Sequence, residues 1–290
     1  AKLWFKELCG GEIPDTLNNL EEAANGEAYE WTDMYAEFAK TAKEDGIELF
    51  VLDDGWFGQR NDDHAGLGDW VANPERLPNG IKGLSERIEA MGIKFGLWFE
   101  PEMTNKDSDL YRAHPDWILH TPGRNASHGR YQYVLDFSRK EVVEYIYEMM
   151  AKILSEAKVS YIKWDMNRSI TECYSVALPA DRQGEVFHRY ILGVYDLYER
   201  LTSEFPEVLF ESCSSGGGRF DPGMLYYAPQ GWTSDDSDAI ERLKIQYGTS
   251  LCYPISSMGS HVSVIPNHQV FRKTPLHTLS LIHISEPTRR

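Results

Sequence analysis

Apolar residues along this chain follow two alternating patterns, one typical of amphipathic helices and one typical of buried strands. Over residues 33–45 they recur at helical spacing, and Gly46 then ends the predicted helix. Residues 47–52 are mostly apolar and predict a buried strand that stops at Asp53. The same order of helix, glycine and strand returns over residues 84–99, so the chain repeats one helix–strand unit.

The pattern predicts a parallel sheet. Strands are expected over residues 47–52, 94–99, 131–137, 159–164, 208–213, 231–236 and 255–264. Helices are expected over residues 33–45, 84–91, 139–154, 182–205 and 239–251, and they separate most of these strands. Because a strand followed by a crossover helix returns in the same direction, such a chain builds an α/β fold with parallel strands.

Two α/β folds fit this alternation. Seven strands and an eighth near the N-terminus would make a (β/α)8 barrel of the TIM type, and the alternative is a doubly wound open sheet. The barrel is favoured because polar side chains follow nearly every strand, and a barrel gathers its strand ends into one mouth. We expect the barrel to span residues 32–276. Residues 1–31 form a ragged N-terminal remnant with a poor first strand, so the barrel is expected to be incomplete at both ends.

The last residues, 277–290, differ in character from the rest. Residues 279–289 resemble translated sequencing-adapter DNA more than natural protein, and the alternative is an ordinary amphipathic tail. The helix expected after the eighth strand would fall in this segment.

Composition narrows the classes of ligand. The 290 residues carry a formal net charge of −16, which argues against nucleic acid and anionic membrane surfaces as partners. Aromatic residues make up 12% of the chain, which suits a protein that stacks on sugar faces but also suits a large core. The four cysteines, Cys9, Cys173, Cys213 and Cys252, are far apart and form no metal or disulfide pattern. No signal or membrane-spanning pattern is present, so a cytoplasmic location is expected.

The segment from residue 161 to 168 carries the strongest chemical signal. Lys163 and Asp165 are two residues apart at the end of a predicted strand, so their side chains lie on one side of it. An ammonium group beside a carboxylate keeps the carboxylate ionised, as a nucleophile requires. A structural ion pair is the alternative, and the position at the strand end beside Trp164 and Asn167 argues against it.

A second group of carboxylates follows the strand at residue 231. Glycoside hydrolysis needs two carboxyl groups across one bond, and Asp235, Asp236 and Asp238 are equal candidates for the second one. Asp235 lies 70 residues after Asp165, which is two barrel units further along. An acidic loop that binds a cation is the alternative.

Two further strand ends are rich in groups that bind ligands. Asp53 and Asp54 could accept hydrogen bonds from sugar hydroxyls or could ligate Mg²⁺ or Ca²⁺, and the residues alone favour neither. The glycine-rich segment 213–221 lets a ligand approach the backbone, but it lacks the lysine of a phosphate-binding loop. Cys213 has no histidine partner in the sequence around it, so a thiol that lines the site is favoured over a nucleophile.

Six segments in register resemble the bacterial α-galactosidases of glycoside hydrolase family 36. They are residues 47–58, 96–103, 161–168, 211–221, 232–239 and 258–269, and the resemblance runs from about residue 32 to about residue 276. One departure lies near the N-terminus, where this chain has Leu20 in place of the tryptophan of an Asn-Asn-Trp-Glu stretch.

The resemblance implies a retaining hydrolysis of terminal α-linked galactose from oligosaccharides such as raffinose or melibiose, without a metal or cofactor. It implies Asp165 as nucleophile and Asp235 as acid/base, facing each other across the barrel mouth. The implied substrate-binding residues are Asp53 and Asp54 at the 4- and 6-hydroxyls, Lys163, Asn167 and Arg130 at neighbouring hydroxyls, Trp98 as a pocket wall, and Cys213 and Gly216 near the 2-hydroxyl.

Four alternatives stay open at this point. A galactosyltransferase or an α-N-acetylgalactosaminidase would use the same chemistry. A truncated sugar-binding fragment would bind without turnover, and a metal-dependent barrel hydrolase would use Asp53 and Asp54. A full-length protein of this family could also form a homo-oligomer.

Overall fold

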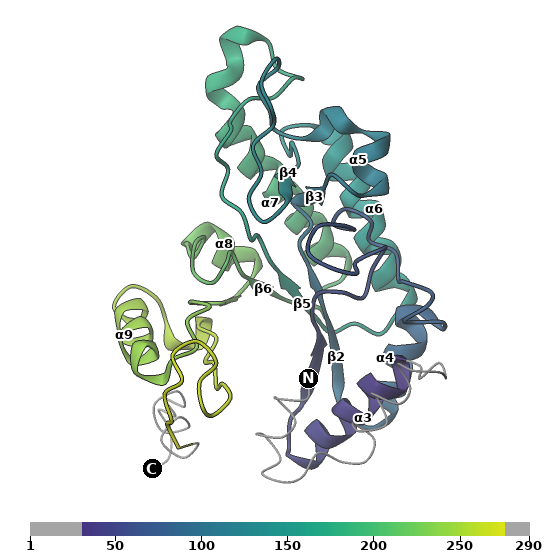
Figure 1. Ribbon diagram of the computed structural model, residues 1–290, viewed down its shortest axis with the longest axis vertical. Coiled ribbons are helices and arrows are strands. Elements are labelled where there is room, and N and C mark those ends of the chain that lie inside the picture. Colours follow the sequence, from purple (N-terminus) through teal and green to yellow (C-terminus); the bar gives the residue numbers. More distant parts are fainter. Residues whose placement is uncertain (1–30, 276–290) are drawn as a thin grey trace.

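The computed structural model describes residues 31–275, and the predictions for residues 1–30 and 276–290 lie outside them. Five parallel strands form its central sheet: β1 (Leu49–Leu52), β2 (Lys94–Phe99), β5 (Tyr161–Trp164), β6 (Leu209–Ser212) and β7 (Gln230–Gly231). The strands lie in the order β1-β2-β5-β6-β7, and Figure 1 labels the middle three of them, β2, β5 and β6. This order never reverses along the chain, whereas a doubly wound sheet reverses at a switch point. The described strands therefore have the order of strands in a parallel barrel.

Helices connect these strands and contact one another in chain order. They are α3 (Trp31–Glu44), α4 (Gly80–Ala90), α6 (Lys140–Glu156), α7 (Val186–Glu204), α8 (Pro222–Tyr227) and α9 (Ala239–Ser250). Contacts run from α3 to α4, from α4 to α6, from α6 to α7 and from α7 to α8, so these five helices form one continuous layer against the sheet. Shorter elements are α5 (Asp109–Ala113), η1 (Pro115–Trp117), η2 (Ala180–Glu185) and η3 (Ile255–Ser257). None of the helices within residues 31–275 is both long and apolar enough to cross a membrane.

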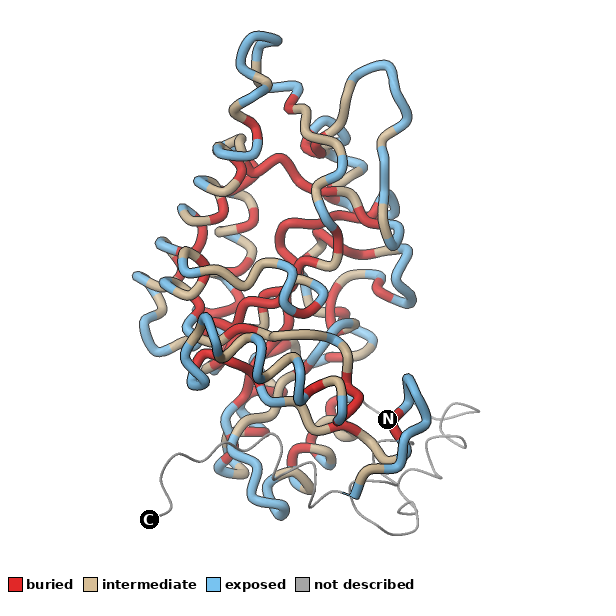
Figure 2. The backbone as a smooth tube through the Cα atoms, turned by 90° about the vertical axis from the view of Figure 1, so that its left-hand side faces the viewer, coloured by how far each residue is buried: buried red, intermediate tan, exposed pale blue. Residues whose placement is uncertain are grey.

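The core lies between the sheet and this helix layer, and Figure 2 shows its buried backbone as a band through the middle of the molecule. Strand β2 is buried from Phe95 to Phe99, as its apolar run predicts. Where β2 ends, Trp98 and Phe99 pack among Trp56, Phe57 and Trp70. This aromatic cluster anchors the end of the sheet at which the candidate site lies.

Three strand predictions are wrong. Of residues 231–236 only Gly231 lies in a strand, the two-residue β7, and residues 232–236 are a loop. Of residues 131–137 only β4 (Gln132–Val134) is a strand, and it pairs antiparallel with β3 (Met103–Asn105) rather than with the central sheet. The expected strand over residues 255–264 is absent, and its one link to the sheet is a bridge between Met258 and Gly231. Three-residue strands are too short for periodicity to show their partner, and an apolar run does not distinguish a strand from an extended segment that packs without pairing.

Candidate active site

Parallel strands bring the predicted site residues to one edge of the sheet. Asp53 follows β1, Asp165 follows β5, Cys213 follows β6, and the segment with Asp235 follows β7. Since all these strands run in the same direction, their carboxyl ends meet at one edge, which is the edge that carries active sites in barrel enzymes. The structure thus places the segments that follow β1, β5, β6 and β7 at one edge of the sheet.

The Asp165 side chain is held by three hydrogen-bond donors. It is 6% exposed. Its Oδ1 accepts the Met166 N–H at 2.8 Å, and its Oδ2 accepts Asn167 Nδ2 at 2.6 Å and Trp98 Nε1 at 3.2 Å. One donor is backbone, one is a neighbour on the same loop and one comes from β2. The carboxylate is therefore fixed in one orientation from three directions.

Asn167 and Trp98 do more than the resemblance implies. Besides its bond to Asp165, Asn167 accepts the Ser215 Oγ hydrogen at its Oδ1 and donates its backbone N–H to Glu100. Trp98 lies buried beneath Asp165 and donates to it directly. Both side chains thus support the Asp165 carboxylate in this structure.

Lys163 is paired differently from the sequence-based expectation. Its Nζ lies 2.9 Å from Asp53 Oδ2, and its ion pair is with that carboxylate rather than with Asp165. Burial favours the neutral amine, but the charge of Asp53, its hydrogen bond to Lys163 and the smaller effects of Cys213 and Asp165 together raise the pKa of Lys163 above its usual range. The ammonium also lies 5.7 Å from the Trp232 ring centre. Lys163 therefore links the loops after β1 and β7.

Asp54 is held by an arginine. Arg60 donates to both of its oxygens, at 2.9 and 2.7 Å, and also to Asn105 Oδ1 at 3.2 Å. The Asp53 and Asp54 side chains are 58% and 39% exposed, so both still face the mouth. Asp53 therefore pairs with Lys163, and Asp54 pairs with Arg60. Within residues 31–275 no group of three His, Cys, Asp or Glu side chains is placed to hold a metal ion.

The structure separates the three carboxylates that the sequence leaves equal. Asp238 is 1% exposed, caps α9 through Glu241 N–H, and pairs with Arg272 at 2.8 Å. Asp236 accepts the Asp238 N–H at 2.9 Å and so closes the turn before α9. Asp235 is exposed, and Trp232 Nε1 donates to its Oδ1 at 2.9 Å. Asp235 is the one of the three whose carboxylate is free to meet a ligand.

At Gly216 the glycine allows another segment of the protein, rather than a ligand, to approach the backbone closely. It has a φ of 85°, and a Cβ at this position would lie 2.5 Å from Ser234 Cα. A bridge joins the two residues, so the glycine-rich loop after β6 carries the loop that holds Asp235. Cys213 starts this glycine-rich loop and is buried. Burial and the Asp165 charge raise the pKa of its thiol, which keeps it a neutral wall of the site.

Arg130 lies in a tight turn that few residue types accept. Arg130 and Tyr131 have φ values of 50° and 60°, and the Gln132 N–H donates to Gly129 O at 2.9 Å. Two consecutive positive φ values closed by this bond define a type I′ turn, which normally holds Asn-Gly. Bulky residues in this conformation cost free energy and are found mainly at functional positions. The turn leaves Arg130 exposed, and its charge acts on Glu100 at the end of β2.

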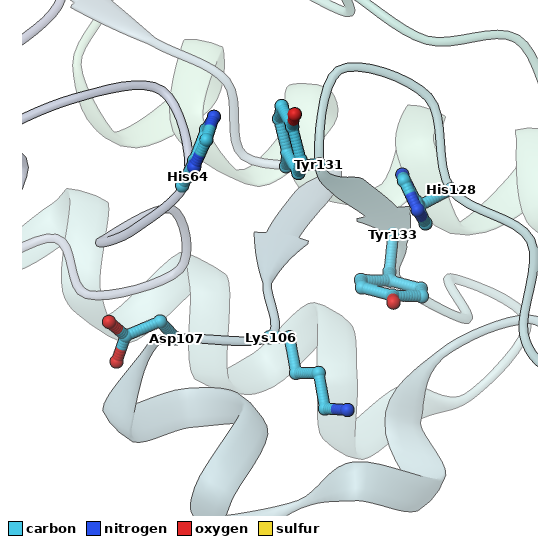
Figure 3. A pocket seen from close by; sticks show the side chains of 6 residues that line it. All are labelled: His64, Lys106, Asp107, His128, Tyr131 and Tyr133. Carbon is cyan, nitrogen blue, oxygen red and sulfur yellow. The ribbon is translucent and has the colours of Figure 1, made fainter.

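An open cavity of about 400 Å³ adjoins this turn (Figure 3). It is lined by His64, Lys106, Asp107, His128, Tyr131 and Tyr133. The rings of His64 and Tyr131 lie 3.6 Å apart between centres. Asn105 donates to Tyr131 O at 3.0 Å and accepts from Arg60, so the cavity connects to Asp54 through two side chains. No pattern in the sequence predicts this cavity, although the aromatic residues His128, Tyr131 and Tyr133 lie close together in the sequence.

Two buried glutamates were also missed as site residues. Glu100 and Glu102 follow β2 and are both fully buried. Glu102 pairs with Arg219 through two bonds of 2.7 and 2.8 Å and accepts from Trp164 Nε1. Glu100 contacts Asn167 and Gln132 and has no ion pair among the described residues. The sequence shows both acids at a strand end, but it does not show that a cation reaches only one of them.

Comparison with known proteins identifies the family. Residues 10–285 match the sequence profile of the melibiase family, which is nearly the whole chain. The chain belongs to the melibiase family. It is 59% identical over 247 residues to α-galactosidase AgaA of Geobacillus stearothermophilus and 57% identical over 237 residues to α-galactosidase Mel36A of Lactobacillus acidophilus. These matches cover 85% and 82% of this chain but only 34% and 32% of the two relatives, so this melibiase chain spans about a third of their length.

Solved structures of AgaA match the fold as well as the sequence. The crystal structure of AgaA has a TM-score of 0.86 at 56% identity, and the match covers 89% of this melibiase chain and 36% of AgaA. The parallel α/β fold expected for the family is thereby confirmed for the described residues. Two AgaA variants were solved with raffinose and with stachyose bound, with TM-scores of 0.86 and 0.85, again at 56% identity and the same coverage. One of these variants replaces an aspartate by asparagine, and the other replaces by alanine an aspartate 70 residues earlier.

Proposed function

We propose that the protein containing this chain is a retaining α-galactosidase with Asp165 as nucleophile and Asp235 as acid/base. The observation that carries the proposal is the contrast between the two carboxylates. Asp165 is buried and fixed by three donors, as an attacking group must be, whereas Asp235 is exposed on a loop anchored beside it. The interval of 70 residues between them equals the interval between the two aspartates replaced in the AgaA complexes, which further supports the pair.

The proposed reaction has two displacements. An Asp165 oxygen attacks the anomeric carbon of galactose while Asp235 gives its proton to the departing glycosidic oxygen, and a galactosyl ester forms on Asp165. Asp235, now a carboxylate, takes a proton from a water molecule that attacks the same carbon. This step breaks the ester and releases galactose with its original configuration. The two carboxyl groups are expected to lie about 5–5.5 Å apart, as in other retaining enzymes.

The proposed substrates are α-galactosides such as raffinose and stachyose, which the AgaA variants bind. Galactose would lie over Asp165, with its hydroxyls toward Asp53, Asp54 and Lys163. The cavity lined by Tyr131 and the residues around it would receive the rest of the oligosaccharide, since aromatic rings stack on the apolar faces of sugars. We also propose a cytoplasmic location, which the free Cys173, Cys213 and Cys252 of the described residues support.

The test uses a completed chain, in which residues 32–275 replace the matching segment of AgaA. Asp235→Ala should still form the galactosyl intermediate from substrates with good leaving groups, and azide should restore its turnover. Asp165→Ala should lose the retaining reaction, and azide should not restore its turnover. The two mutants are the same substitution, so each is the control for the other. Identical responses to azide and to leaving group would refute the two roles, and loss of activity in EDTA would favour the metal-dependent alternative.

A further inference from the structure

Glu100 is a buried acid without a partner of opposite charge. It is fully buried, directly after β2, and its two oxygens accept from the Asn167 N–H and, at 2.9 Å, from Gln132 Nε2. No lysine, arginine or histidine within residues 31–275 forms an ion pair with it. A carboxylate buried in this way costs several kcal/mol unless it is paired, and such a group lowers the cost by keeping its proton.

Glu102 is a control within the same structure. It lies two residues further along and is equally buried, but Arg219 pairs with it through two bonds. Glu102 therefore has the partner that a buried carboxylate requires, and Glu100 does not. The difference lies in their neighbours, since the two side chains have the same chemistry and the same exposure.

A neutral Glu100 would supply a hydrogen-bond donor to an amide whose oxygen has none. Gln132 Oε1 is buried and has no hydrogen-bond donor. A protonated Glu100 carries an O–H group, which is the donor that this pair lacks. With half a turn of the Gln132 amide, its oxygen would lie where the nitrogen now lies, 2.9 Å from Glu100 and within reach of an O–H···O bond, and its nitrogen would take the position of the present oxygen.

Through Asn167, Glu100 reaches the proposed nucleophile. Glu100 accepts the backbone N–H of Asn167, and the Asn167 side chain donates to Asp165 Oδ2 at 2.6 Å. We propose that Glu100 is a positioning residue that, as a neutral acid bridging Gln132 and Asn167, fixes the amide that orients Asp165. This proposal rests on the proposed role of Asp165, although the neutrality of Glu100 can be tested without it.

The charges around Glu100 support the neutral form. Burial and then the negative charge of Asp165, from the β5 end, raise the pKa of Glu100 to about 8. The bonds from Asn167 and the positive charge of Arg130, from the turn before β4, oppose the increase without cancelling it. Arg168 donates to the backbone oxygen of Gln132 at 3.1 Å. A second negative charge beside Asp165 is thus avoided near neutral pH.

Neutrality is tested by the dependence of stability on pH. The pKa of Glu100 is higher in the folded than in the unfolded protein, so its contribution to stability is full below about pH 4.5 and is lost as the pH rises to about 8. Glu100→Gln has no proton to lose. We therefore expect the melting temperature of the completed chain with E100Q to gain steadily on the wild type between about pH 5 and pH 8, and to gain no more above that. Glu102→Gln, the matched control, should lower the melting temperature without this trend. A pH-independent difference for E100Q would overturn the neutral acid.

Positioning is tested by kinetics on the same completed chain. Glu100→Ala removes the acceptor for Asn167, and we expect kcat to fall about 30-fold or more with KM changed less than about threefold. E100Q keeps an oxygen for the Asn167 N–H, so it should stay within about fivefold of the wild-type kcat. Equal kcat values for E100A and E100Q, or a loss explained by the unfolded fraction, would overturn the positioning role. If the wild-type completed chain does not cleave α-galactosides, the proposed function fails, whereas the stability test still decides whether Glu100 is neutral.

Discussion

Breaking the pair of Glu102 and Arg219 should cost far more stability than breaking the exposed pair of Glu144 and Arg200. Glu102 is fully buried, Arg219 is 12% exposed, and two bonds of 2.7 and 2.8 Å join them. Arg219→Met leaves a carboxylate in the core without its cation. Removing one partner of a buried pair costs about 3–5 kcal/mol, because the remaining charge is stranded.

Glu144 and Arg200 provide a matched comparison. They also form two bonds, at 2.8 and 3.0 Å, but their side chains are 53% and 29% exposed. Solvent screens this pair, and exposed pairs contribute about 0–1 kcal/mol. Arg200→Met should therefore change the stability little, so the two identical substitutions are expected to differ clearly in their cost.

The stability costs of both substitutions are measured by urea denaturation of the completed chain. Pulse proteolysis at each urea concentration reports how much of the segment 32–275 is unfolded. We expect R219M to lower the unfolding midpoint clearly and R200M to leave it nearly unchanged. R219M should also lower activity, since Arg219 lies in the loop that carries Cys213 and Gly216. Similar small losses in both variants would refute the reasoning, because burial is the main difference between the pairs.

Three further predictions follow from single features of the structure. Gly216→Ala should lower both the melting temperature and kcat/KM, because its Cβ would overlap Ser234. Gly217→Ala is not a suitable control, because a Cβ at residue 217 would also overlap its neighbours. Tyr131→Gly relieves a positive φ and should raise stability by about 0.5–1 kcal/mol while raising KM for raffinose more than for a chromogenic galactoside. Leu243→Lys with Tyr247→Lys, in the exposed apolar stripe of α9, should reduce self-association of the 290-residue chain in size-exclusion chromatography, and unchanged association would contradict a role for this stripe.

Local pattern was sufficient to predict the repeated elements of this fold. Helical spacing over residues 33–45 and 139–154 reappears as α3 and α6, displaced by two residues or fewer at each end. The apolar run at residues 94–99 is β2 with the same bounds. These predictions hold because backbone hydrogen bonding imposes a period that neighbouring residues record in their polarity. Parallel strands then require that polar groups after each strand meet at one edge, so the sequence also predicts where the site lies.

Partner choice was decided only by the tertiary structure. The sequence sets Lys163 beside Asp165, but 110 residues of chain fold so that its ammonium meets Asp53. Periodicity gives no sign that β4 pairs with β3 rather than with the central sheet.

The tertiary structure also decided which carboxylates are free to meet a ligand. Asp238 and Asp235 are equivalent in the sequence, and burial against Arg272 removes Asp238 from the site. Glu100 and Glu102 are likewise two acids in one motif, and Arg219 reaches only the second. Amino-acid type and spacing determine which groups are brought to the barrel mouth. Ion pairing and burial depend on distances between segments far apart in the chain, and those distances exist only once the sheet and its loops have folded.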